Sequence, residues 1–133
     1  MVMSKECTIR AYGVRRTGTA KCSSIPVTHQ RIDRGVSFPR VDRWFSADVQ
    51  AFTAQVTVSD DTHRTLHFLI YFTHDTARYR ESEAVLRNVP GRTWHGEFLV
   101  FRRALHSKKL VNVRARDHIH IWLAIKRLIA DEA

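Results

Sequence analysis

Cysteine is scarce in this sequence. Cys7 and Cys22 are the only two copies, and neither belongs to a C-x-x-C pair. A framework of disulfides is therefore excluded, and a reducing compartment is the simpler expectation. The sequence leaves open whether Cys7 and Cys22 pair with each other.

Long apolar runs are also missing. Residues 1–6 hold no apolar core of signal-peptide length, and the runs at 68–72 and 119–125 are far too short to cross a bilayer. We expect a protein without a membrane span that resides inside the cell, in the cytoplasm or the nucleus.

Glycine occupies five positions, and none of them belongs to a phosphate-binding loop. The patterns G-x-x-x-x-G-K-[ST] and G-x-G-x-x-G are both absent. Histidine has eight copies, but no H-E-x-x-H pair occurs. His118 and His120 stand two apart on a predicted helix, where they point in different directions. We expect no metal site and no cofactor.

Acidic residues are few relative to basic ones. The chain has 13 Asp and Glu against 22 Lys and Arg, of which 17 are Arg, and its formal net charge is +9. Arg presents a planar fork of donors that suits phosphate and carboxylate groups, and an excess of this size attracts polyanions. The alternative is an Arg-rich proteome, in which the excess carries no binding role.

The charge is unevenly distributed along the chain. Residues 1–47 hold nine basic and three acidic residues, a net charge of +6, whereas residues 48–133 hold 13 basic and ten acidic residues, a net charge of +3. The first segment has one short predicted strand, Cys7 to Tyr12, followed by Gly, Ser or Pro every few residues, which favours loops. We therefore expect a basic, loop-rich arm over 1–47 that packs on a single domain over 48–133.

Alternating apolar and polar residues predict strands in the second segment. Residues 49–59 and 64–73 follow a period of two on either side of a polar turn, which is the pattern of an antiparallel hairpin. Two further strands are predicted at 97–103 and 110–114, with another polar turn between them.

Two helices complete the predicted domain. Asp75 is the expected N-cap of a helix that ends at Arg87, and Asp117 is the expected N-cap of a closing helix that runs to about residue 131. The fold class predicted is α+β, a four- to five-stranded, mainly antiparallel sheet packed against the C-terminal helix.

The basic residues give the leading hypothesis for function, a non-enzymatic module that binds an anionic partner, with nucleic acid ahead of acidic protein. The last two strands would bring several of them to one end of the sheet, to contact a phosphate backbone. Tyr71, Trp94 and Phe101 would then stack on unpaired bases. The candidate anion-binding residues are Arg15, Arg16, Arg102, Arg103, Lys108, Lys109 and Arg114.

Two other classes of function stay open. The closing helix carries apolar residues off its main stripe, at Ile119, Trp122 and Leu123, so it is either deeply buried or part of a protein–protein interface, such as that of a homodimer. His95 and Glu97 would project from one face of an extended segment, which suits a small hydrolase or nuclease. Pairing of these two residues for stability is the simpler interpretation.

Overall fold

A sheet of seven strands and two α-helices make up the part of the chain that the computed structural model describes, residues 4–15, 17–30, 36–45, 48–58, 64–105 and 109–132. The elements in chain order are β1 (Ser4–Val14), β2 (Ala20–Gln30), β3 (Val36–Pro39), β4 (Gln50–Thr57), β5 (Thr65–Phe72), α1 (Glu83–Asn88), β6 (Phe98–Arg103), β7 (Leu110–Val111) and α2 (His118–Glu132). Short 3-10 turns precede β4 at Val41–Arg43 and α2 at Ala115–Asp117.

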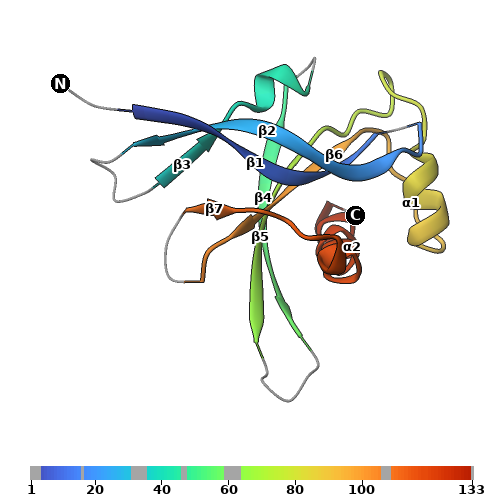
Figure 1. The fold of residues 1–133 in the computed structure, drawn as a ribbon. Coiled ribbons are helices and arrows are strands. Elements are labelled where there is room, and N and C mark those ends of the chain that lie inside the picture. The colour runs from blue at the N-terminus through green and yellow to red at the C-terminus, as the bar shows by residue number, and fades with distance from the viewer. Residues whose placement is uncertain are drawn as a thin grey trace.

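The sheet is antiparallel, with the strand order β3-β2-β1-β6-β5-β4 and β7 paired to the end of β6. The predicted hairpin is confirmed as β4 and β5, in a register that places Ala54 opposite Phe68. The predicted fold class is also confirmed, because α2 packs on this sheet (Figure 1). The strand count is higher than the four to five expected, since the sequence pattern gave no signal for β2 and β3.

The N-terminal segment corrects the expectation of loops. β1 and β2 pair over their full length, from Ser4 opposite Gln30 to Val14 opposite Ala20. Pro26 is tolerated in β2 because its backbone polar groups lie on the edge that faces away from β1. Its carbonyl accepts a hydrogen bond from the Arg40 N–H on that edge, so the N–H that proline lacks would not have paired with β1. The division of the chain at residue 47 stays a prediction, although β1 is hydrogen-bonded into the same sheet as β6.

The joint between β1 and β6 is short, and it sets the shape of the sheet. Only three residue pairs form it, from Tyr12 opposite Val100 to Val14 opposite Phe98. Earlier in β1 the two strands diverge, and the chain after β7 fills the gap, where Val113 donates its backbone N–H to the Arg10 carbonyl at 2.8 Å. β1 and β2 consequently run across the direction of β4 and β5 (Figure 1).

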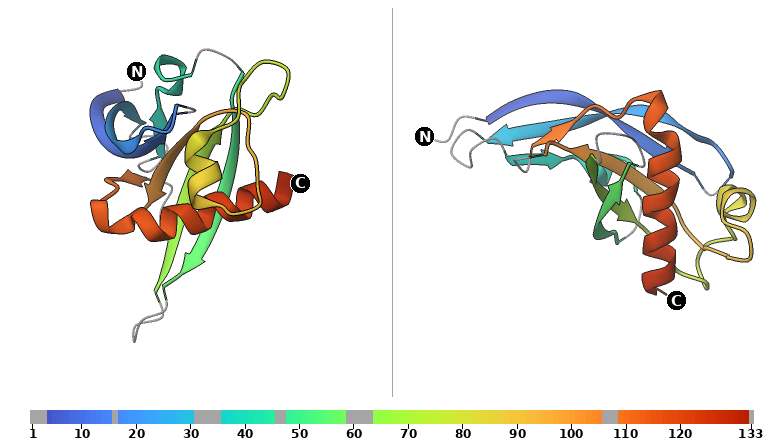
Figure 2. Two further views of the ribbon diagram at one scale, coloured as in Figure 1. Left: turned by 90° about the vertical axis from the view of Figure 1, so that its right-hand side faces the viewer. Right: turned by 90° about the horizontal axis from the view of Figure 1, so that it is seen from below.

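Both faces of the central strands are buried, as the alternation along β6 shows. Phe98 and Val100 belong to a core under α1 and α2, and Figure 2 shows α2 running across β4 and β5. Leu99 and Phe101 belong to a second core on the opposite face. That second core is closed by residues of β1 and β2 and by Phe45, which follows the 3-10 turn. A strand buried on both faces explains why β6 reads as a continuous apolar run.

The first helix is shorter than predicted. α1 begins at Glu83, with Ser82 as its N-cap, whereas Asp75 accepts a hydrogen bond from the backbone of Ala77 within a turn. The backbone N–H of Asp75 donates to His95, and that of Ser82 donates to Trp94. These long-range hydrogen bonds hold the chain between the two residues outside a helix, which local sequence patterns do not reveal.

The closing helix matches its prediction closely, but the apolar residues off its main stripe divide into buried and exposed ones. α2 begins at His118, and the 3-10 turn before it ends at Asp117. Trp122 is buried and donates a hydrogen bond from its Nε1 to the Tyr12 hydroxyl at 3.3 Å, which ties the helix to β1. Ile119 and Leu123 are 68% and 40% exposed. Within the described ranges, no helix is both long and apolar enough to cross a bilayer.

The two cysteines lie apart on the β1–β2 hairpin. Cys22 stands opposite Tyr12, whereas Cys7 stands opposite Val27, five residues further along. At about 3.4 Å per residue the separation far exceeds the reach of a disulfide, and Cys22 is a free thiol.

We predict that Gly96→Ala lowers the free energy of unfolding by about 3 kcal/mol or more. An added Cβ at Gly96 would lie 1.8 Å from the Thr73 carbonyl oxygen, so the backbone beside β5 would have to move. Urea denaturation measures the loss. Gly91→Ala is the matched control, because its Cβ would meet nothing within 4 Å and only its positive φ of 77° costs about 1 kcal/mol. Equal losses for the two variants would contradict this account of Gly96.

We also predict that stability falls as the pH rises above 10. Burial raises the pKa of Tyr12, with smaller opposing effects from the Trp122 hydrogen bond, which lowers it, and Cys22, which raises it. The unfolded chain therefore loses this proton at a lower pH than the folded chain, and the folded state loses stability from the unfolded pKa upwards. In denaturation experiments between pH 8 and pH 11, the free energy of unfolding should fall less steeply with pH in Tyr12→Phe than in Tyr79→Phe. The second variant is the control, because it keeps Tyr12. The same slope in both variants would rule out this role.

Candidate functional site

The predicted basic residues at the end of β6 lie close together but on two faces. Arg102 and Arg103 are successive strand residues, so their side chains point to opposite sides of the sheet. Arg102 reaches Asp117, with its Nη1 3.4 Å from both carboxylate oxygens. Arg103 lies on the face of the second core, where its charge acts on Tyr71, whose pKa is raised by burial and lowered to a smaller extent by Arg103.

Arg102 and its partner form the floor of a small hollow of about 100 Å³, which we call the Arg102 hollow. Four chain segments contribute to it: the β4–β5 hairpin, β6, the 3-10 turn and α2. Its lining consists of Val58, Arg64, Leu66, Arg102, Arg116, Asp117 and His120. Three arginines against one aspartate give this lining a formal charge of +2 with His120 neutral.

Local hydrogen bonds bring these cations together. The backbone N–H of Val58 donates to the Arg64 carbonyl at 2.7 Å, which closes the β4–β5 hairpin and places Arg64 beside the hollow. Asp117 is 4% exposed, and its Oδ2 accepts a hydrogen bond of 2.9 Å from the Arg114 backbone. This contact fixes the 3-10 turn and presents Arg116 at the opening. Asp117 therefore holds Arg102 and also fixes the turn that carries Arg116.

The remaining predicted residues divide into three groups. Lys109 and Arg114 lie near the Arg102 hollow, since the Lys109 carbonyl accepts from Ala104 just after β6 and Arg114 begins the 3-10 turn. Arg16 and Lys108 lie outside the described residues. Arg15 is at the other end of β6, beside Glu97. The five residues from Glu97 to Arg102 span roughly 16 Å in a strand, so the predicted set does not form one cluster.

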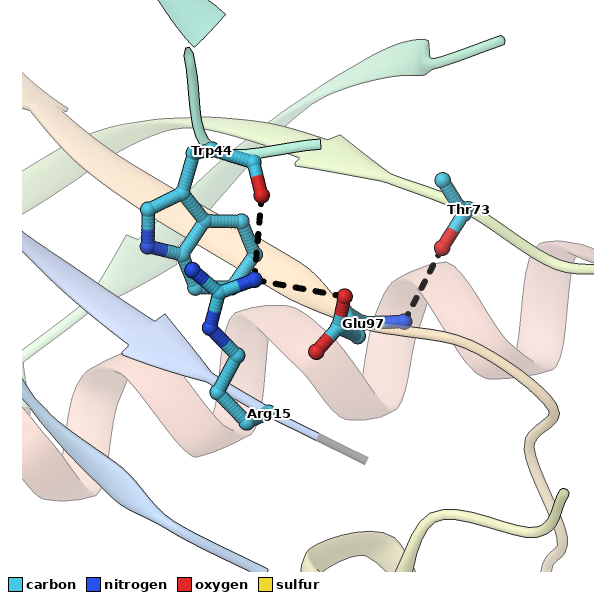
Figure 3. Close-up of polar contacts among 4 residues, drawn as sticks. All are labelled: Arg15, Trp44, Thr73 and Glu97. Carbon is cyan, nitrogen blue, oxygen red and sulfur yellow. Dashed lines mark hydrogen bonds and ion pairs between the residues drawn. The ribbon is translucent and has the colours of Figure 1, made fainter. Parts of the chain in front are cut away.

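Arg15 belongs to a second arrangement, built on Trp44 (Figure 3). Its guanidinium carbon lies 3.6 Å from the centre of the Trp44 ring, within the range of a cation–π contact. Its Nη1 donates to the Trp44 carbonyl at 3.0 Å and lies 3.4 Å from Glu97 Oε1. The backbone N–H of Glu97 in turn donates to Thr73 Oγ1 at 3.1 Å. Arg15 is thus held by three contacts with two residues, Trp44 and Glu97, both far from it in sequence.

The second arrangement borders a hollow of about 290 Å³, which we call the Trp44 hollow. Gly13 makes room for the indole, because a Cβ there would lie 2.8 Å from Trp44 Cζ2. On β2, Lys21 stands directly opposite Gly13, and Ser23 follows on the same face by the two-residue period of a strand. The described residues of the lining are Gly13, Arg15, Thr19, Lys21, Ser23 and Trp44. These six residues include two cations and no carboxylate.

A third hollow carries no net charge. It measures about 500 Å³ and is lined by Thr17, Arg78, Arg80, Glu81 and Glu83. Two arginines and two glutamates balance one another there. Its size exceeds that of the other two hollows, but its charge gives no preference for an anion.

The residues suggested for catalysis are each held by other groups. His95 Nδ1 lies 2.9 Å from the Tyr79 carbonyl, and Glu97 is the carboxylate that contacts Arg15. The backbone N–H of His95 donates to His74 Nδ1, and the His74 ring stacks on Trp94. Across the described parts of the chain, no three His, Cys, Asp or Glu side chains come together as a metal ion would need. A His–carboxylate pair for hydrolysis stays a hypothesis without support from these contacts.

The predicted base-stacking residues are mostly core residues. Trp94 and Phe101 are 1% and 0% exposed, so the expectation that they stack on bases is wrong, and only Tyr71 is partly accessible. Among the described residues that line the hollows, the aromatic one is Trp44, which was not among the predicted site residues. Sequence reasoning also missed Lys21, Arg64 and Arg116, since their relevance depends on strand pairing and on the turn before α2.

Comparison with known proteins gave no match, whether to a family model, a curated protein or a solved structure.

We predict that Arg102 is needed for stability as well as for charge. Arg102→Met leaves the buried Asp117 carboxylate without its cation and should lower the free energy of unfolding by about 3 kcal/mol. The double variant Arg102→Met/Asp117→Asn should recover most of this loss, because no buried charge is left unpaired. Urea denaturation of the four proteins in this cycle measures both effects. Additive losses would contradict a coupled pair.

Proposed function

We propose that the protein is a non-enzymatic module that binds nucleic acid through its phosphate backbone, at the Arg102 hollow. The observation that carries this proposal is the convergence of Arg64, Arg102 and Arg116 on one small hollow, whose described lining contains one carboxylate, Asp117. Lys109 and Arg114 lie nearby and extend the positive surface along the β6–β7 end of the sheet. A row of cations that exceeds its local acids is the electrostatic footprint of phosphate-backbone binding.

The size of the hollow supports contact with a backbone group. At about 100 Å³ it falls below the range of about 300–1,000 Å³ in which small-molecule sites usually lie. A phosphate oxygen can meet the guanidinium groups at its opening, while the bases of the strand stay outside. Recognition of this kind is independent of base sequence and sensitive to salt.

The roles of the three arginines differ. Arg102 is only 23% exposed and already contacts Asp117, so it contributes to the electrostatic potential and to the shape of the hollow. Arg116 is exposed on the turn before α2, and Arg64 is exposed at the start of β5. Arg116 is therefore the residue whose replacement should weaken binding without loss of the fold.

We predict that Arg116→Glu weakens binding of a labelled 20-nucleotide DNA at least tenfold at about 100 mM salt. For this variant, the slope of the logarithm of the binding constant against the logarithm of the salt concentration should also become shallower by about one, because one phosphate contact is lost. Fluorescence anisotropy over a series of salt concentrations gives both quantities. Arg92→Glu is the matched control: the same change of charge, on an exposed loop residue near the opposite end of β5.

Three results would count against the proposal. The first is an absence of salt-dependent DNA binding, and the second is an equal weakening of binding by the two variants, as net charge alone would produce. Tighter binding of a poly-glutamate chain than of DNA of equal charge would instead assign the surface to an acidic protein partner.

A further inference from the structure

We infer that the Trp44 hollow is a separate binding site for a phosphomonoester group. This inference does not rest on the proposed function, because the hollow lies at the other end of β6 and shares no lining residue with the Arg102 hollow. It rests on how Arg15 is held, on which groups face it and on the size of the space between them.

Arg15 is oriented with part of its donor set unused. Its contacts with the Trp44 carbonyl and with Glu97 both use Nη1. Among the described residues, no hydrogen-bond partner faces Nε or Nη2, and the side chain is 40% exposed. Nε and Nη2 form one edge of the guanidinium fork, and this edge binds two oxygens of a phosphate or carboxylate in parallel. Stacking on Trp44 fixes the plane of the fork before any ligand arrives.

The groups across the hollow complete an oxyanion site. Lys21 stands opposite Gly13 on the neighbouring strand and supplies a second cation. Thr19 and Ser23 add hydroxyl donors to the same lining. Glu97, the nearest acid to Arg15, binds Nη1 and is not part of the lining. The described residues of the lining therefore carry a charge of +2, which matches a phosphomonoester dianion better than a carboxylate.

The space suits a phosphate that is attached to a small group. A volume of about 290 Å³ is close to the lower limit of about 300 Å³ for small-molecule sites, so a bare phosphate would leave much of the hollow empty. The indole of Trp44 provides an apolar wall, against which a sugar or a flat ring can pack. The phosphomonoester can come from a free sugar phosphate or nucleotide, or from the 5′ end of a nucleic-acid strand.

The test is calorimetric titration of the full chain with ribose 5-phosphate, adenosine monophosphate and a 5′-phosphorylated dinucleotide. Ribose, adenosine and the dinucleotide with a free 5′ hydroxyl lack the phosphomonoester group and should not bind measurably at this site. Lys21→Gln should weaken binding of the phosphorylated ligands at least tenfold. Lys126→Gln, the same change at an exposed position of α2, should leave it unaltered. Both positions are on the surface, and circular dichroism confirms that the variants fold.

The outcomes separate this site from the proposed function. Arg116→Glu should leave binding of ribose 5-phosphate unchanged, whereas Lys21→Gln should leave the salt slope for DNA nearly unchanged. A dinucleotide that binds more tightly than adenosine monophosphate identifies a strand end as the source, and the reverse order identifies a free small molecule. Failure of every phosphomonoester to bind, equal binding by both lysine variants, or equal affinity for sulfate would overturn the inference.

Discussion

The short joint between β1 and β6 is the constraint on which the rest of the structure depends. Three residue pairs, Tyr12–Val100, Gly13–Leu99 and Val14–Phe98, connect the N-terminal hairpin to the central strands. On one face of this joint, Tyr12 and Val14 pack with Phe98 and Val100 under α2. On the other face, Gly13 leaves room for Trp44. One backbone connection thus closes the first core and allows Trp44 to border the second.

The same joint explains why the two basic hollows are separate. It aligns the end of β1 with the beginning of β6, so Arg15 meets Glu97 there. β1 then diverges from β6 toward the opposite end, and the strand β7 takes its place beside Arg102 and Arg103. Of the two arginines that are adjacent in β6, Arg102 contacts Asp117 and Arg103 lies on the opposite face, whereas Arg15 contacts Trp44 at the other end of the strand. Their separation follows from the pairing of strands and not from the distribution of charge.

The sequence predicted those parts of the fold that are set by local patterns. The alternation in β4 and β5 and the apolar stripe of α2 depend on short-range periodicity, and both are present as expected. The strand β2 escaped prediction, because Ser23, Ser24 and Pro26 resemble a loop and are tolerated only between particular neighbours. Residues 75–82 also escaped prediction, because their backbone is fixed by hydrogen bonds to Trp94 and His95. In the candidate site, the charge pattern of the sequence predicted Arg15 and Arg102. Their contacts with Trp44 and Asp117 could be identified only from the tertiary structure.

An excess of positive charge destabilises a small domain through repulsion between like charges, and the two hollows reduce this repulsion in the same way. Like charges that converge on one place repel each other, and the effect grows as water is excluded. In the Arg102 hollow a buried carboxylate holds the least exposed arginine, which leaves the exposed ones at the opening. In the Trp44 hollow, Glu97 and the Trp44 carbonyl both bind Nη1 of Arg15, and no described residue forms a hydrogen bond with Nε or Nη2. An internal acid that binds only part of a cationic cluster stabilises the empty site and preserves its attraction for an anion. A site that exists only to neutralise charge would instead place its acids at the opening, where Arg116 and Lys21 stand.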